Sequence, residues 1–227
     1  MVTAVIFDLD DTLYDEIEYC KSGFWAVAEF LADSLKSIDA ERIFKALWVQ
    51  FTSGNRRNVF NAALDELSIP YDSKLIDELV RVYRCHVPQI TLPADSRDIL
   101  CQLRDKYMLG LITDGFLPAQ RLKVQALGIE KYFRCIIYTE ELGRDFWKPS
   151  PAGFEKILRI LNAEPKNIVY VADNEKKDFI APNKLGFFTV QLKRPARLHN
   201  KTRDETGAKA QYVIAEICQL TGLLEKL

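Results

Sequence analysis

Five short segments of the chain are almost continuously apolar instead of alternating between apolar and polar residues. They occupy residues 4–7, 108–113, 135–139, 168–172 and 187–192. Strands with this pattern are buried on both faces, as in a parallel sheet. Between the later segments, apolar residues recur with a helical period, for example over residues 154–161 and 117–127. The alternation of strand and helix predicts an α/β fold with a Rossmann-like parallel sheet.

The first two apolar segments are separated by about a hundred residues, far more than one crossover helix requires. Helical stripes of apolar residues fall at 24–31, 43–51, 60–67 and 76–83. These stripes predict an all-helical domain inserted into the sheet domain. We expect the helical domain at residues 15–90, and the α/β core at residues 1–14 and 91–227. A further helix is predicted in the core at residues 95–106.

Composition and charge narrow the classes of partner. Lys and Arg total 31 against 32 Asp and Glu, so there is no basic field to attract nucleic acid or anionic lipid. No apolar stretch approaches the roughly 20 residues needed to span a bilayer, and the first residues form a strand pattern instead of a signal peptide. We therefore expect a cytoplasmic protein without nucleic-acid or membrane partners.

The five cysteines are scattered along the chain, and none forms a C-x-x-C pair. An odd number without paired spacing argues against both a disulfide framework and a zinc site. We expect these thiols to be reduced and buried.

Acidic residues crowd the end of the first predicted strand, where Asp8, Asp10 and Asp11 fall within four positions. In an open parallel sheet the ligand crevice lies beyond the carboxyl ends of the strands. The strand period of two predicts that Asp8 and Asp10 point to the same side. Two carboxylates about 4 Å apart repel by roughly 4 kcal/mol at an effective dielectric constant near 20. Such a cluster requires cations nearby.

Residues suited to an anion follow the second and third predicted strands. Thr113, Asp114 and Gly115 form a turn with a hydroxyl group and a glycine, which can cradle a phosphate with side-chain and backbone donors. Lys148 follows the third strand and adds a positive charge. We expect these four residues to bind a phosphate group at the same edge of the sheet.

Further acidic residues, Asp173 and Asp178, follow the fourth predicted strand. Their oxygens, together with those of Asp8 and Asp10, are the hard ligands that Mg²⁺ prefers. The sequence therefore predicts a Mg²⁺ site beside the phosphate site.

The combination of these motifs resembles the haloacid dehalogenase superfamily. The motifs are D-L-D-D-T from Asp8, Thr113 in I-T-D-G, Lys148 in K-P, and the pair Asp173 and Asp178. The resemblance covers essentially the whole chain, and the superfamily's helical C1-type cap is inserted just after the first motif, where the helical insert is predicted. The chain is similar to the subgroup of acylneuraminate phosphatases and pyrimidine nucleotidases.

The resemblance implies that Asp8 is the nucleophile and forms an aspartyl-phosphate. Asp10 would then be the general acid and base, and its crowded surroundings should raise its pKa. Thr113 and Lys148 would hold the phosphoryl oxygens. Dehalogenases of the superfamily lack an acid at the position of Asp10, because a halide leaves without a proton, so the resemblance favours phosphoryl transfer.

For the metal, the resemblance implies ligation by Asp8, by the backbone carbonyl of Asp10 and by Asp173. Asp178 would act either as a direct ligand or through a water molecule. Mg²⁺ is the cofactor that these oxygen ligands indicate.

The function predicted from these residues is a Mg²⁺-dependent phosphatase for a small phosphorylated metabolite, either a sugar phosphate or a nucleoside monophosphate. The cap would close over the crevice and exclude water. A phosphomutase of the same superfamily is the first alternative, because it differs only in rephosphorylating its product. A non-catalytic phosphate-binding regulatory protein is the second alternative. We expect a monomer or a homodimer.

Other polar residues leave alternatives open. Asp11 is expected to support its loop by hydrogen bonding instead of reacting. Arg56 and Arg57 either contact a substrate anion or lie at an exposed helix start. His86 is expected to be a hinge or packing residue. The basic stretch at residues 193–209 either attracts anionic substrates or is a solvated loop.

Overall fold

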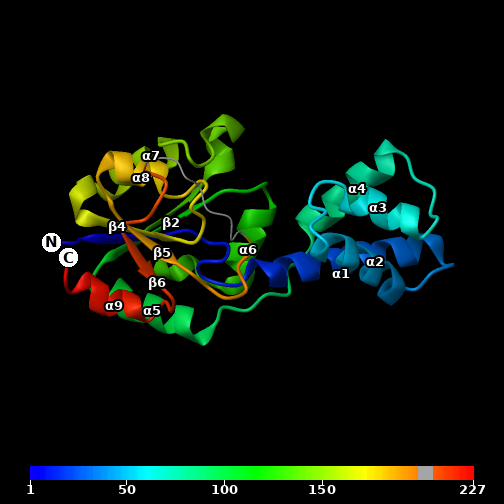
Figure 1. Ribbon diagram of the computed structural model, residues 1–227, viewed down its shortest axis with the longest axis horizontal. Coiled ribbons are helices and arrows are strands. Elements are labelled where there is room, and N and C mark those ends of the chain that lie inside the picture. Colours follow the sequence, from blue (N-terminus) through cyan, green and yellow to red (C-terminus); the bar gives the residue numbers. More distant parts are fainter. Residues whose placement is uncertain (199–206) are drawn as a thin grey trace. The chain divides into compact units, whose positions relative to one another are not determined.

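The computed structural model describes residues 1–198 and 207–227. The chain forms two compact units, which are drawn in Figure 1. The first unit comprises Met1–Ile17 and Thr91–Leu227, and the second comprises Glu18–Ile90. The chain thus enters the second unit after Ile17, slightly later than the expected boundary after residue 14, and leaves it after Ile90.

A six-stranded sheet forms the centre of the first unit, with the strand order β3-β2-β1-β4-β5-β6 and every neighbouring pair parallel. The predicted parallel α/β sheet is therefore confirmed, and β6 is an additional edge strand that the apolar pattern did not indicate. The strands are β1 (Ala4–Phe7), β2 (Met108–Thr113), β3 (Cys135–Tyr138), β4 (Ile168–Ala172), β5 (Phe188–Leu192) and β6 (Tyr212–Ile214).

Helices cover both faces of this sheet, with α5 and α9 on one face and α7 and α8 on the other (Figure 1). The bounds are α5 (Ala94–Arg104), α6 (Ala119–Leu127), α7 (Ala152–Leu161), α8 (Ile180–Leu185) and α9 (Gln219–Leu224). Short 3₁₀ turns lie at Glu130–Tyr132, Thr139–Leu142, Arg144–Phe146 and Pro165–Asn167. The helices predicted at residues 95–106, 117–127 and 154–161 are confirmed.

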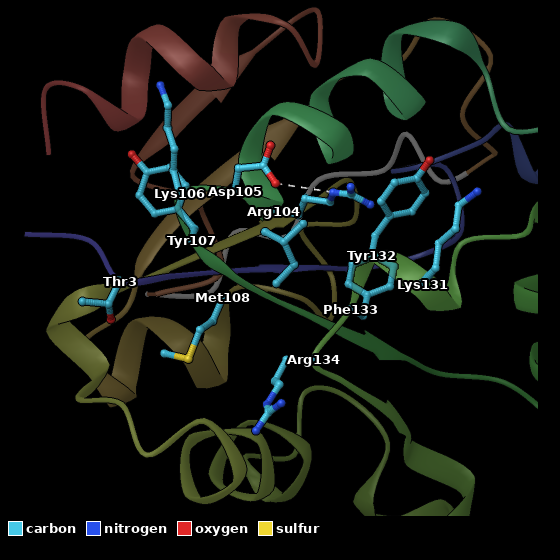
Figure 2. A pocket seen from close by; sticks show the side chains of 11 residues that line it. Thr3, Arg104, Asp105, Lys106, Tyr107, Met108, Lys131, Tyr132, Phe133 and Arg134 are labelled. Carbon is cyan, nitrogen blue, oxygen red and sulfur yellow. Dashed lines mark ion pairs between the residues drawn. The ribbon is translucent and has the colours of Figure 1, made fainter.

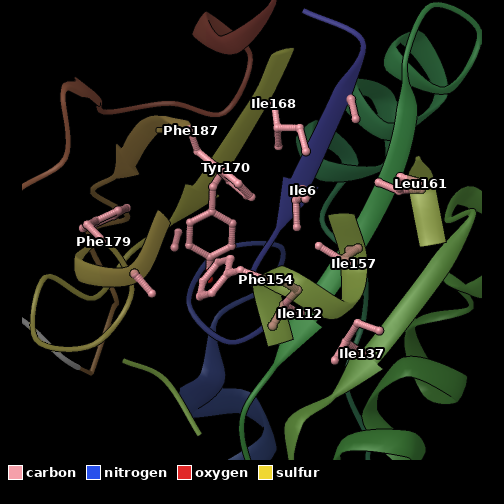
Figure 3. Close-up of a cluster of buried hydrophobic side chains, with 13 residues drawn as sticks. Ile6, Ile112, Ile137, Phe154, Ile157, Leu161, Ile168, Tyr170, Phe179 and Phe187 are labelled. Carbon is pink, nitrogen blue, oxygen red and sulfur yellow. The ribbon is translucent and has the colours of Figure 1, made fainter. Parts of the chain in front are cut away.

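The hydrophobic core beneath α7 explains why the strand sequences are continuously apolar. Phe154 and Ile157 of this helix pack on side chains from the central strands, including Ile112 and Tyr170 (Figure 3). The rings of Phe154 and Tyr170 meet edge to face with their centroids 4.9 Å apart. Burying one side chain of this size stabilises the fold by roughly 1.5–3 kcal/mol. Because helices cover both faces, every residue of the central strands β1 and β4 is buried, whichever face it points to.

The second unit consists of four helices, and each predicted helical stripe falls on one of them, although the stripe at residues 60–67 extends one residue beyond its helix. Two of the helices begin at aspartate N-caps: Asp39 accepts from the backbone N–H of Arg42, and Asp72 accepts from that of Leu75. The bounds are α1 (Glu16–Leu35), α2 (Ala40–Thr52), α3 (Val59–Glu66) and α4 (Ser73–Cys85).

Aromatic side chains fill the interior of the helical unit around Phe24. Its ring lies 5.1–6.5 Å, between centroids, from four other aromatic rings. Aromatic pairs at such separations add about 0.5–1.5 kcal/mol each beyond the area that they bury. The four neighbours of Phe24 are Trp48, Phe51, Phe60 and Tyr83.

Two polar residues of the helical unit have structural contacts. The guanidinium of Arg56 lies 3.6 Å from the ring centroid of Phe51, so this side chain packs on its own unit. Nδ1 of His86 lies 2.7 Å from the carbonyl oxygen of Tyr83, and Nε2 of His86 lies 3.0 Å from the hydroxyl oxygen of Ser22. The expected packing role of His86 is confirmed.

All five cysteines are free thiols, as expected from their spacing, but the expectation that they are buried is wrong for most of them. Only Cys20 is fully buried, whereas Cys85, Cys101 and Cys218 are exposed because they lie on the outer faces or ends of helices. Within the described ranges, the helices lack the length and apolar content that a membrane span needs.

Candidate active site

The strand order reverses between β1 and β4, and the loops after both strands meet there. From β1 the chain order continues to β2 and β3 on one side, and from β4 to β5 and β6 on the other. A parallel sheet opens its ligand crevice at such a reversal, beyond the carboxyl ends of the strands. Asp8 follows β1, and its backbone N–H donates to the carbonyl of Val171 at 2.9 Å. Asp173 follows β4 directly, so both aspartates lie at this crevice.

Lys148 bridges two of the predicted site residues. Its Nζ lies 2.5 Å from Asp8 Oδ1 and 2.7 Å from Asp178 Oδ1, and it donates to the Tyr170 hydroxyl at 3.1 Å. Burial raises the pKa of Asp8 to about 6, although the ammonium of Lys148 opposes this shift. Burial alone would lower the pKa of Lys148, but Asp178 and Asp8 hold it well above its ordinary value. The lysine therefore stays charged between its two acidic partners.

Three of the predicted metal ligands form one group. Asp8, Asp173 and Asp178 are buried, and each offers a carboxylate oxygen within 4.8 Å of the others. Oδ2 of Asp173 is buried, and no described residue forms a hydrogen bond with it. Burial, followed by the charges of Asp178 and Asp8, raises the pKa of Asp173 to about 9. Crowded, buried carboxylate oxygens of this kind can hold a divalent cation such as Mg²⁺.

The Asp114 side chain connects the loops after β2 and β3. Its Oδ1 accepts a hydrogen bond from the Thr139 hydroxyl at 2.8 Å and another from the backbone N–H of Lys148 at 3.2 Å. These bonds hold the loops after β2 and β3 together. Any contact of Asp114 with a phosphate would therefore come from its backbone N–H, because an ionised carboxylate has no proton to donate.

The turn after β2 presents the donors expected for a phosphate site. The Thr113 hydroxyl oxygen accepts from Nε2 of Gln120 at 2.6 Å, which leaves the hydroxyl proton to donate. Gly115 has a φ of +145°, and a Cβ at this position would lie 2.8 Å from the Gln120 side chain. Only glycine fits both the backbone conformation and the space, so the turn keeps Thr113 and Gln120 in contact.

Asp10 lies in a separate polar network instead of joining the metal-binding group. Its Oδ1 accepts from the Tyr14 hydroxyl at 2.6 Å and from Lys123 Nζ at 2.8 Å, and its Oδ2 accepts from Gln120 Nε2 at 2.8 Å. The strand β1 ends at Phe7, so the two-residue alternation does not extend to Asp10. Asp8 and Asp10 consequently pair with different lysines.

The expected raised pKa of Asp10 is wrong. Burial alone would raise it, but the charge of Lys123 and the hydrogen bonds from Lys123, Tyr14 and Gln120 outweigh burial and hold the pKa below its ordinary value. Asp10 is therefore ionised at neutral pH in this state of the protein.

Gln120 and Lys123 are site residues that the motifs did not identify. Both are buried polar residues, and they lie three positions apart on α6, on the same helical face. Lys123 also lies 3.9 Å from Glu16 Oε1. One sequence feature could have identified them. Gln120 and Lys123 place an amide and an ammonium on the buried face of the helix that follows the I-T-D-G turn.

Asp11 supports its loop, as expected. It has a φ of +55°, a left-handed conformation that Asp tolerates better than most residues. Its Oδ1 accepts from the backbone N–H of Glu16 at 2.9 Å, and its Oδ2 accepts from that of Leu198 at 2.6 Å. The side chain thus connects the loop after β1 to the segment after β5.

Replacing Asp11 by alanine is expected to lower the free energy of unfolding by about 2 kcal/mol, because two backbone N–H groups lose their acceptor. Urea denaturation monitored by circular dichroism would measure the change. The exposed residue Asp145 provides the control, and Asp145→Ala should unfold at the same urea concentration as the wild type. Equal midpoints for both variants would contradict the supporting role of Asp11.

The start of the basic stretch also packs against the loop after β1. Arg194 donates through Nε to the Thr12 carbonyl at 3.0 Å, and through Nη2 to the Ser96 hydroxyl at 2.6 Å. Arg194 is therefore a structural residue of the first unit. Residues 199–206 of the basic stretch lie outside the described residues.

A pocket of about 600 Å³ lies at the opposite, amino end of β2 (Figure 2). Its charged lining contains several basic residues and a single carboxylate, Asp105, whose Oδ1 lies 3.6 Å from Nε of Arg104. This pocket contains no group of carboxylates that could hold a metal, so we place the reactive site at the other end of the sheet. The basic lining residues are Arg104, Lys106, Lys131 and Arg134.

Known proteins are similar to this chain over most of its length. The family model described as haloacid dehalogenase-like hydrolase matches residues 2–186. A glyceraldehyde 3-phosphate phosphatase from Methanopyrus kandleri is 29% identical over 202 residues, which cover 86% of this chain and 85% of the relative. The N-acylneuraminate-9-phosphatase of Homo sapiens is 24% identical and is matched over 100% of this chain and 95% of the relative. Both names support the predicted phosphatase class.

Solved structures confirm the predicted fold. The 2-haloacid dehalogenase from Pseudomonas syringae pv. Tomato DC3000 superimposes with a TM-score of 0.68 and 25% sequence identity. The match covers 100% of this chain and 99% of that chain.

Proposed function

Because the chain belongs to the haloacid dehalogenase-like hydrolases, we propose that it is a Mg²⁺-dependent phosphatase that hydrolyses a small phosphomonoester. The reaction proceeds through an aspartyl-phosphate on Asp8. The proposal rests above all on the presence of two differently held carboxylates on one loop. Asp8 lies against Lys148 and the metal-binding group, whereas Asp10 lies in the network of Lys123.

This division of the two carboxylates favours a phosphatase over a dehalogenase. Release of an alcohol requires a proton donor near the leaving oxygen, and release of a halide does not. Asp10 provides such a group, and the group of Asp8, Asp173 and Asp178 can hold a divalent cation beside the nucleophile. The relatives that are named phosphatases also cover most of the chain.

In the first step, a carboxylate oxygen of Asp8 attacks phosphorus and the bond from phosphorus to the ester oxygen breaks. Asp10 donates a proton to the departing oxygen, so that the product leaves as an alcohol. The resting Asp10 is ionised beside Lys123. Entry of a phosphate group with about two negative charges raises the pKa of Asp10, so that Asp10 takes up from solvent the proton that it donates.

In the second step, Asp10 accepts a proton from a water molecule that attacks the phosphorus of the aspartyl-phosphate. The bond to Asp8 breaks, inorganic phosphate leaves and the carboxylate of Asp8 is restored. The network around Asp10 keeps both of its oxygens in place through three donors. The sum of both steps is one phosphomonoester and one water converted into an alcohol and inorganic phosphate.

The residues that would hold Mg²⁺ are Asp8, Asp173 and Asp178, with the backbone carbonyl of Asp10 as a further ligand. When bound, the ion neutralises negative charge on the phosphoryl oxygens and the nucleophile. Lys148 fixes the orientation of Asp8 toward the crevice through the 2.5 Å contact. Thr113 donates its hydroxyl proton to the phosphoryl group.

The substrate proposed is a small phosphorylated sugar or aldehyde. Both compared relatives are named for compounds of this kind, glyceraldehyde 3-phosphate and N-acylneuraminate 9-phosphate. These two compounds therefore come first in a substrate panel, followed by other sugar phosphates and nucleoside monophosphates.

The test is a panel assay that measures inorganic phosphate and the dephosphorylated product in the same samples, with Mg²⁺ or with EDTA. We expect equal amounts of both products for at least one compound, and loss of the activity in EDTA. Conversion of a substrate into a phosphorylated isomer without release of phosphate would indicate a phosphomutase. Turnover that is unchanged in EDTA would contradict the metal requirement, and binding of phosphate without any turnover would indicate a regulatory protein.

A further inference from the structure

The ammonium of Lys148 has no donor left for a substrate. An ammonium group has three N–H donors. In this site the three nearest acceptors are Asp8 Oδ1 at 2.5 Å, Asp178 Oδ1 at 2.7 Å and the Tyr170 hydroxyl at 3.1 Å. The side chain is only 1% exposed. Lys148 could bind a phosphoryl oxygen only by giving up one of these contacts.

A second lysine, Lys177, faces the same acidic residues with a more accessible ammonium. Its Nζ lies 3.5 Å from Asp114 Oδ2, beyond the usual range for a hydrogen bond, and its side chain is 30% exposed. Within residues 1–198 and 207–227, Asp114 is the only acid in ion-pair distance. The carboxylates of Asp8, Asp173 and Glu16 also interact electrostatically with this ammonium.

Lys177 lies beside the turn after β2, and its charge acts on the nucleophile Asp8. Asp114 immediately follows Thr113, whose hydroxyl oxygen accepts from Gln120 and whose hydroxyl proton is therefore free to donate to a ligand. An ammonium beside Asp114 is therefore close to the place where a phosphate would contact both Thr113 and Asp8. A phosphate in that place would carry about two negative charges among several carboxylates, so it requires a cation with donors to spare.

We infer that Lys177 binds the phosphoryl oxygens of the substrate, while Lys148 positions Asp8 and Asp178. This inference deepens the proposed phosphatase function and rests on it for the identity of the transferred group. The sequence motifs assigned both phosphate binding and the positioning of the acidic residues to Lys148. We now assign phosphate binding to Lys177 and the positioning to Lys148. The chemical ligand of Lys177 is the phosphate dianion, and inorganic phosphate, the product, is its simplest form.

The experiment compares Lys177→Gln with Lys176→Gln, because the adjacent Lys176 is exposed and the two variants remove the same charge. Binding of inorganic phosphate is measured by titration calorimetry with Mg²⁺ present. We expect the dissociation constant to rise about 10- to 100-fold in Lys177→Gln, as for loss of a charge-assisted hydrogen bond. In Lys176→Gln it should stay within about twofold of the wild-type value.

A charge-conserving variant separates ligand binding from a general structural effect. Lys177→Arg keeps the cation, so it should bind phosphate within about tenfold of the wild type and more tightly than Lys177→Gln. Wild-type affinity in Lys177→Gln, or equal losses in the Arg and Gln variants, would overturn the inference.

Phosphate binding requires no turnover, so this inference and the proposed function fail separately. Weaker phosphate binding in Lys177→Gln, together with no hydrolysis of any panel compound by the wild type, would support the inference and reject the phosphatase. Hydrolysis by the wild type with unchanged phosphate binding and unchanged kcat/KM in Lys177→Gln would support the phosphatase and reject the inference.

Discussion

Asp8→Asn is expected to lower phosphate release by roughly a thousandfold or more, to the limit of detection. The amide has almost the same shape as the carboxylate, but it lacks the negative charge and the nucleophilicity that the first step requires. Asp10, the other acid of the same loop, cannot replace it, because Asp10 is held by Lys123 and Gln120. The measurement is steady-state phosphate release on the best substrate of the panel.

The covalent step gives a second readout of the same variant. Wild-type protein quenched in acid during turnover of a ³²P-labelled substrate should retain label, and Asp8→Asn should retain none. The variant should also remain folded, because the amide oxygen can still accept from Lys148, Lys148 keeps its ion pair with Asp178, and the repulsion of Asp8 with Asp173 and Asp178 is removed. Asp145→Asn, a change at an exposed site, serves as the control and should keep full activity. Labelled Asp8→Asn protein would rule out Asp8 as the nucleophile.

Lys148→Met is expected to have the largest effect on stability. The change leaves Asp8 and Asp178 buried without the cation that they share, and removing one partner of a buried ion pair lowers the free energy of unfolding by about 3–5 kcal/mol. Denaturation in EDTA measures this loss. Mg²⁺ should restore a large part of it, because a dication that binds the same carboxylates stabilises only the folded protein.

The matched control is Lys166→Met. Lys166 Nζ lies 2.8 Å from Glu164 Oε2, a separation like those in the Lys148 cluster, but both side chains are exposed. Loss of this exposed ion pair in Lys166→Met should leave the denaturation midpoint unchanged, with or without Mg²⁺. A Lys148→Met protein as stable as this control in EDTA would show that the buried acids are compensated in another way.

The central strands could be predicted from the sequence because helices bury them on both faces, which makes each one a continuous apolar segment. The edge strand β6 gave no such signal. It has three residues, Tyr212, Val213 and Ile214, of which only Ile214 is buried. A short strand with one covered side cannot be distinguished from a loop by its apolar pattern.

The acidic and basic motif residues could be predicted as neighbours because each follows a parallel strand, and all the strand ends lie on one edge. Gln120 and Lys123 could not be found in this way. They belong to a helix, and their contact with Asp10 depends on how α6 docks on the sheet. The pKa of Asp10 was mispredicted for the same reason, since the ammonium beside it is 113 residues away in the chain.

The bond between Asp11 and the backbone of Leu198 joins residues 187 positions apart. A ribosome therefore synthesises the acidic loop long before the segment that closes over it. Contacts of such high sequence separation slow the folding reaction. The groups that compensate the aspartates all come from later parts of the chain: Lys123 from α6, Lys148 from the loop after β3, and the backbone N–H of Leu198 from the segment after β5. The reactive centre can therefore be completed only after almost the whole first unit has been synthesised.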